Sequence, residues 1–122
     1  MRRVLLLAAG LTLLGAGPAA ARSSEPSRAP ARLLVQASEF RLSLSRTTVP
    51  AGTAIVQLAN IGMDPHDLRL APLRGGRART IAETLPGGRG QWNGKLTRGR
   101  WRLVCTLEGH AAAGMRATLR VR

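Results

Sequence analysis

The sequence of 122 residues predicts an all-β protein folded as a β-sandwich. The main observation is an alternation of apolar and polar residues, which places every second side chain on the same face of a strand. It is clearest near the end of the chain, where Ala117, Leu119 and Val121 alternate with polar residues. A second observation is the regular spacing of turn residues, among them 14 Gly and 7 Pro. No long segment has helical periodicity, so short strands joined by turns are expected.

Each expected strand follows from the same pattern. Residues 39–45 alternate apolar and polar side chains, which predicts a half-buried strand. Residues 49–53 contain Pro and then Gly, which predicts a turn. Residues 54–59 are apolar at every position but one, as expected of a strand in the centre of a sandwich. The Thr-Arg-Gly-Arg run at 97–100 predicts a hairpin turn. Further short strands are expected at 67–70, 79–85, 91–96, 101–105 and 117–121.

The composition excludes several kinds of site. A single Cys excludes an intrachain disulfide, a zinc ribbon and a CxxC redox pair. Two histidines exclude three-histidine zinc sites and multi-copper clusters. What remains is a small module with at most one mononuclear metal site. The formal net charge of +13 is interpreted as a solubilising surface or as one that steers an acidic partner. No nucleic-acid partner is expected, because side chains that stack on bases are nearly absent.

The beginning of the chain resembles an export signal. Two arginines precede an apolar run from 4 to 14, and small residues follow up to Ala21. The run is shorter than the roughly 18 apolar residues that a membrane span needs, although an uncleaved leader would tether the protein to the membrane. We therefore expect a periplasmic or secreted protein. The expected organisation is a signal peptide at 1–21, a flexible tether at 22–31 and a folded domain at 32–122.

Four side chains form the candidate functional site. Cys105, His110 and Met115 follow one another in a C-x4-H-x4-M spacing between two expected strands, and His66 lies upstream in another loop. Loops at one end of a sandwich cluster together, so these residues can converge. Two imidazoles, a thiolate and a thioether are the donors of a blue copper site. Sulfur suits Cu(I) and the nitrogens keep Cu(II) accessible, so a single copper ion that cycles between these states is the expected cofactor.

Three further residues are expected to support this site. Gly109 and Gly114 precede two of the candidate ligands, where a tight loop needs unusual backbone angles. Asp67 is expected either to join the two loops by a hydrogen bond or to be solvated.

These segments make the chain resemble the small single-domain cupredoxins, the plastocyanin- and azurin-like blue copper proteins. The resemblance implies a Greek-key β-sandwich, one bound copper and electron transfer between larger redox partners. It also assigns the copper ligands to His66, Cys105, His110 and Met115. The matching stretches are Ala37–Gly52, Asn60–Leu70 and Arg98–Val121. The Arg- and Gly-rich middle of the chain departs from the family, and this affects the partner surface.

Other interpretations of the same residues stay open. Cys105 could be a plain core residue, and Met115 could fill a gap at the head of the last strand. His66 could pair with Asp67 at the surface, and Met63 is a competing axial ligand. A cysteine hydrolase would use the thiol with a histidine base but leaves the thioether unexplained. Zinc would accept the nitrogens and the thiolate but gains little from methionine.

The expected function is that of an exported one-electron carrier, monomeric and without enzymatic activity. We expect redox partners to dock transiently near His110, because the small residues 111–113 would leave a flat apolar patch there. The alternative is a protein that binds and hands on copper without electron transfer. A third interpretation, a metal-free binding sandwich, predicts no stoichiometric copper.

Overall fold

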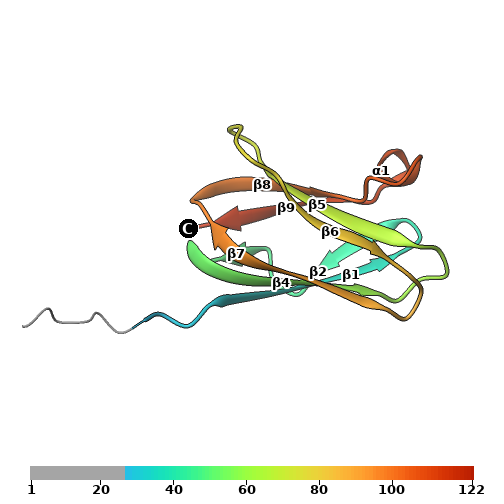
Figure 1. The fold of residues 1–122 in the computed structure, drawn as a ribbon. Helices are drawn as coiled ribbons and strands as arrows, with labels where there is room; N and C mark the ends of the chain where they lie inside the picture. Colours follow the sequence, from blue (N-terminus) through green and yellow to red (C-terminus); the bar gives the residue numbers. More distant parts are fainter. Residues whose placement is uncertain (1–26) are drawn as a thin grey trace, which may run out of the picture.

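The computed structural model describes residues 27–122 and confirms an all-β sandwich. Two sheets lie face to face as two layers (Figure 1). The first strand begins at Ala31, one residue before the expected start of the domain. The expected signal peptide at 1–21 lies outside the described residues. In the part that is described, no helix has the length and apolar character needed to cross a membrane.

The two sheets contain strands that are distant in sequence. The four-stranded sheet has the order β2 (Arg41–Leu44), β1 (Ala31–Ser38), β4 (Gly52–Asn60) and β7 (Arg89–Leu96). The five-stranded sheet has the order β3 (Thr48–Val49), β9 (Arg116–Val121), β8 (Gly99–Val104), β5 (His66–Pro72) and β6 (Arg79–Thr84). The pairs β1–β4 and β3–β9 are parallel, and the other pairs are antiparallel. The connections β2–β3, β3–β4, β4–β5, β6–β7 and β7–β8 pass between the two sheets, so most strands that are consecutive in the chain are not neighbours in a sheet.

The core forms where the inward faces of the two sheets meet. Burial alternates along β1, as the period of a strand requires. Trp101 is 1% exposed, and its indole N–H donates to the carbonyl of Thr97 at 3.0 Å, so its polar group is satisfied inside the core. Each large apolar side chain buried here contributes roughly 1.5–3 kcal/mol. The largest buried apolar side chains include Val35, Val56, Leu58, Leu68, Leu70, Leu96, Trp101, Leu103, Met115 and Leu119.

Two sequence-based expectations about the strands were wrong. The strand expected at 39–45 begins only at Arg41, because Glu39 and Phe40 form the turn between β1 and β2. The hairpin turn expected at 97–100 does not join paired strands. β7 pairs with β4, whereas β8 pairs with β5 and β9, so this turn carries the chain from one sheet to the other.

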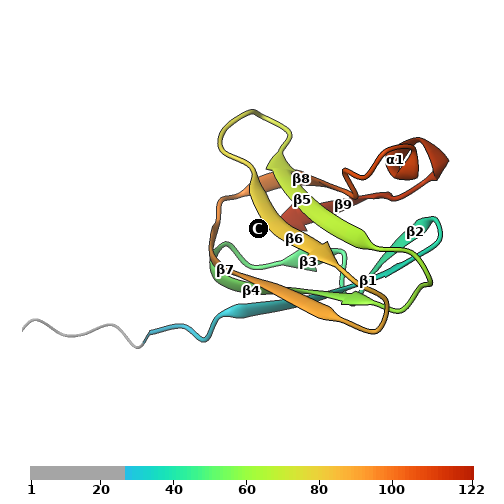
Figure 2. The same cartoon turned by 45° about the vertical axis from the view of Figure 1, so that its right-hand side comes forward.

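The sandwich brings three chain segments to the same end. β5 begins at His66, β8 ends one residue before Cys105, and the four-residue helix α1 (His110–Ala113) lies in the loop between β8 and β9. Figure 2 shows α1 and the start of β5 at this end of the molecule, next to the turn between β1 and β2. His66 was expected in a loop, but it is the first residue of the strand. Residues far apart in sequence therefore meet here.

Candidate metal centre

Three of the four candidate ligands meet in one cluster. The donor atoms of His66, Cys105 and His110 all lie within 4.8 Å of one another. The two Nδ1 atoms of the histidines are 3.2 Å apart, and Nδ1 of His110 is 3.5 Å from the sulfur of Cys105. His66 and Cys105 are fully buried, and His110 is half-buried. Both imidazoles therefore turn Nδ1 into the cluster.

Glu39 sets the orientation of the His66 ring. Its Oε1 lies 3.0 Å from Nε2 of His66, on the far side of the ring from the cluster. The same oxygen accepts the backbone N–H groups of Met63 at 2.9 Å and Asp64 at 2.8 Å. These contacts, led by the Asp64 N–H, lower the pKa of Glu39 to about 2. The carboxylate is then ionised and can only accept, so Nε2 of a neutral His66 carries the proton and Nδ1 is free to bind a metal.

Backbone hydrogen bonds close the loop that carries the other candidate ligands. The N–H of Cys105 donates to the carbonyl of Met115 at 3.1 Å, and the N–H of Met115 donates to the carbonyl of His110 at 3.0 Å. Gly109 and Gly114 have φ values of 79° and 126°, as the sequence predicted for a tight loop. Met115 is fully buried at the head of β9 and belongs to the core. The loop thus fixes the backbone of all three residues relative to one another.

Asp67 joins the two segments of the site. Its Oδ1 accepts the N–H of Thr106 at 2.5 Å, and its Oδ2 accepts the hydroxyl of the same residue. Asp67 follows His66, and Thr106 follows Cys105, so these hydrogen bonds tie the two buried candidate ligands together. The expected link between the loops is confirmed. The alternative pairing of His66 with Asp67 at the surface was wrong, because His66 is buried and contacts Glu39.

The chemistry of the thiol depends on its environment. Burial raises the pKa of Cys105. Hydrogen bonds with the backbone of Asp67 and Leu107 lower this pKa, but by less than burial raises it. The thiol is therefore protonated at neutral pH, and a metal that binds it as a thiolate must displace the proton. This environment does not favour a cysteine nucleophile, which needs a lowered pKa.

The rim of the site is apolar. Phe40 is 42% exposed, and its ring meets that of His110 edge-on with centroids 5.2 Å apart. Ile61 and Met63 are also exposed, on the loop whose N–H groups bond to Glu39. Met63 is 84% exposed, which does not favour it as an axial ligand. Phe40 is therefore a large, partly exposed apolar side chain beside His110.

Sequence reasoning missed one residue of the site, Glu39. Its only signal in the sequence was its position in the Ala37–Gly52 stretch, where it was interpreted as one polar residue of a strand. The contact with His66 depends on the turn between β1 and β2 lying against the loop at 61–65, and no local pattern predicts that packing.

Comparisons with known proteins identify the fold. No protein-family model and no curated protein matches the chain. Reduced auracyanin from the photosynthetic bacterium Roseiflexus castenholzii is similar with a TM-score of 0.62 and 18% identity, over 75% of this chain and 96% of that one. Auracyanin A, a blue copper protein from Chloroflexus aurantiacus, gives a TM-score of 0.61 and 16% identity, over 77% of this chain and 100% of that one. The fold is that of a cupredoxin. Amicyanin has the same fold, and a reduced variant of it gives a TM-score of 0.54 and 17% identity, over 79% of this chain and 87% of that one.

The residues of this cupredoxin fold suit copper chemically. The cluster offers two imidazole nitrogens and one thiol sulfur, and a thioether lies in the same loop. Sulfur with imidazole nitrogen suits both oxidation states of copper, whereas carboxylate and carbonyl oxygens suit magnesium or calcium. The carboxylates of Glu39 and Asp67, which contact His66 and the residue after Cys105, are engaged in hydrogen bonds that orient the site.

Proposed function

We propose that the protein is a blue copper protein that carries single electrons between redox partners. The observation that carries this proposal is the convergence of His66, Cys105 and His110, whose donor atoms lie within 4.8 Å of one another in a cupredoxin fold. Met115 is proposed as the weak axial ligand, because it is buried in the same loop. Copper bound here would supply a one-electron couple between Cu(II) and Cu(I).

The protein's own residues would hold the donors in a fixed arrangement. Glu39 holds the His66 ring with Nδ1 toward the thiol, and Asp67 fixes the segment that follows Cys105. The buried sulfur is kept from water by the core around it. A site that is fixed before it binds copper changes little when an electron arrives or leaves, and this keeps transfer fast.

The electron is proposed to pass through His110. It is the half-buried member of the cluster, whereas His66 and Cys105 are fully buried. Exposed Phe40, Ile61 and Met63 add apolar area to this end of the molecule. A small apolar patch suits a transient complex, in which a partner must dock and leave quickly. We therefore propose that redox partners dock against this rim.

The remaining parts of the proposal follow from the sequence. The leader-like segment at 1–21 supports export to the periplasm or out of the cell. A carrier of this kind acts as a monomer and catalyses no reaction of its own.

A visible spectrum tests the function. Adding Cu(II) to the metal-free protein is expected to give an intense band near ~600 nm, which a reductant bleaches and an oxidant restores. Cys105→Ser is expected to remove the band, because a hydroxyl is neither soft nor readily ionised. Met63→Leu is the matched control, since it alters an exposed thioether and leaves the cluster intact.

Other outcomes would contradict the proposal. A colourless protein that retains only Cu(I) would identify a copper-handling protein. A protein that takes up no stoichiometric copper would overturn the metal centre itself.

A further inference from the structure

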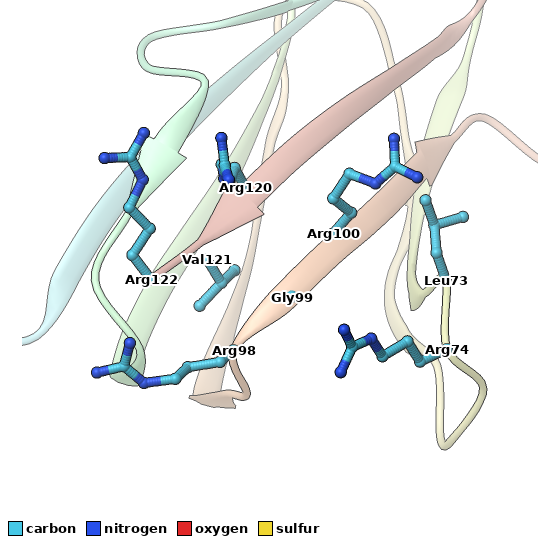
Figure 3. Close-up of a pocket in the computed structure, with 8 residues that line it drawn as sticks. All are labelled: Leu73, Arg74, Arg98, Gly99, Arg100, Arg120, Val121 and Arg122. Atoms are coloured by element: carbon cyan, nitrogen blue, oxygen red, sulfur yellow. The ribbon is translucent and has the colours of Figure 1, made fainter.

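The end of the sandwich opposite the metal centre carries a cluster of arginines. Figure 3 shows their side chains gathered around the start of β8 and the end of β9. They surround a hollow of about 830 Å³, together with Leu73, Gly99 and Val121. The five residues, called the arginine face below, are Arg74, Arg98, Arg100, Arg120 and Arg122.

Among the side chains of residues 27–122, no carboxylate pairs with the arginine face. All five side chains are exposed, and within residues 27–122 none of them forms a salt bridge or a side-chain hydrogen bond. The five acidic residues of this part of the chain lie elsewhere: Glu39, Asp64 and Asp67 at the metal end, Glu83 on β6, and Glu108 in the loop after Cys105. The hollow is lined by no Asp or Glu. Five guanidinium groups therefore present their donors to solvent, and their positive potentials add.

The arginine face is too distant from the cluster to serve electron transfer. Arg100 and Arg120 are partners in the β8–β9 register, whereas Cys105 and Met115 lie just beyond the other ends of the same strands. The six residue-to-residue steps from Gly99 to Cys105 span roughly 20 Å at about 3.3 Å per step. A redox partner seated here would be far from His110. The arginine face therefore fits a partner other than the one that exchanges electrons.

The described chain begins at this same end. Ser27 and Arg28 lie beside the turn at 50–53, with which they line a second hollow. The N–H of Ala51 in that turn donates to the carbonyl of Arg122 at 2.6 Å. Residues that precede Ser27 therefore join the domain next to the arginine face, and these residues include the apolar run from 4 to 14. An uncleaved leader would therefore bring the membrane to the end of the domain where the arginines lie.

We propose that the arginine face binds the anionic headgroups of a phospholipid bilayer and so holds the metal centre pointing away from the membrane. A guanidinium pairs with phosphate through two parallel hydrogen bonds, and several such groups on one face attract an anionic surface. Leu73, which is 41% exposed, gives the face an apolar side chain that can enter the interface. In this orientation the apolar rim around His110 is free for soluble redox partners.

Vesicle binding of the full chain tests the proposal. The probes are vesicles of phosphatidylcholine alone and vesicles with about one third phosphatidylglycerol, so binding through any apolar segment cancels in the comparison. The variant R98Q/R100Q/R122Q is expected to lose roughly 100-fold of its affinity for the anionic vesicles. The control R41Q/R69Q/R89Q has the same net charge, and its exposed positions lie outside the arginine face. It is expected to lose about threefold or less, because those charges lie farther from the bilayer.

Three results would overturn the proposal. The first is equal binding of the two triple variants, which would mean that only overall charge matters. The second is a wild-type chain that does not prefer the anionic vesicles. The third is an arginine-face variant that no longer binds soluble polyglutamate but still binds the anionic vesicles, which would identify an acidic protein as the partner. Thermal unfolding verifies that each variant is folded, and R74Q/R120Q repeats the test with the other two arginines.

Discussion

Replacing Asp67 with Ala is expected to destabilise the fold and weaken the metal centre together. The carboxylate accepts two hydrogen bonds from Thr106, and Asp67 is only 9% exposed. Hydrogen bonds to a charged group contribute about 1.5–3 kcal/mol each. Thr106 is exposed, so its freed N–H and hydroxyl regain water, and the expected loss is about 2–3 kcal/mol in total. For a domain of this size, that loss lowers Tm by about 10–20 °C.

Urea unfolding of the metal-free, reduced protein at neutral pH measures this loss. A double-mutant cycle with Thr106→Val isolates the hydrogen bond from the hydroxyl, because valine keeps the backbone N–H, and a coupling free energy of about 1 kcal/mol or more is expected. Glu83→Ala is the matched control, because it also removes one carboxylate, from an exposed position on β6. It is expected to change stability by less than about 0.5 kcal/mol.

The same variant is expected to bind copper about 10- to 100-fold more weakly, since Asp67 fixes the segment that follows Cys105. The reasoning fails if the destabilisation is no larger than that of Glu83→Ala. It also fails if the double-mutant cycle gives no coupling, because the hydrogen bond from the Thr106 hydroxyl would then carry no energy.

Further predictions concern the proposed ligands and Glu39. Met115→Leu is expected to keep copper and raise the reduction potential, because a weak donor is lost; an unchanged potential in voltammetry would make Met115 a spectator. Copper uptake is expected to release protons and to weaken as the pH falls, because the Cys105 thiol with its raised pKa must ionise; pH-stat titration measures the protons, and none released would contradict thiolate binding. The folded-state pKa of Glu39 is about 2 rather than 4.5, so its stabilisation is complete above pH 4.5 and lost as the pH falls toward 2. Glu39→Gln is therefore expected to have a lower free energy of unfolding than the wild type at pH 7, and this difference is expected to shrink near pH 2. A difference that stays the same at every pH would disprove the role of the carboxylate.

The fold class was predictable because it depends on local patterning. Alternation along residues 117–121 and the apolar stretch 54–59 correspond to β9 and to the buried β4. β1 was missed: no strand was expected at 32–38, although Leu33, Val35 and Ala37 lie at alternate positions and are buried in the core. Sheet membership was not predictable: β7 and β8 are adjacent in sequence and separated only by a short turn, yet they lie in different sheets. Which strands pair depends on which arrangement of strands buries the most apolar surface, and this is a property of the whole sandwich.

The chemistry available to this protein follows from its composition and from the spacing of a few residues. One Cys and two His can form only a single small site, and the spacing of Cys105, His110 and Met115 places three donors on one loop. Tertiary structure decided the rest. It brought His66 to that loop, placed Glu39 against its outer nitrogen, and gathered five arginines at the opposite end. These arrangements join residues separated by tens of positions, so they exist only when the two sheets pack, and the packing energy comes from apolar side chains that take no part in the chemistry.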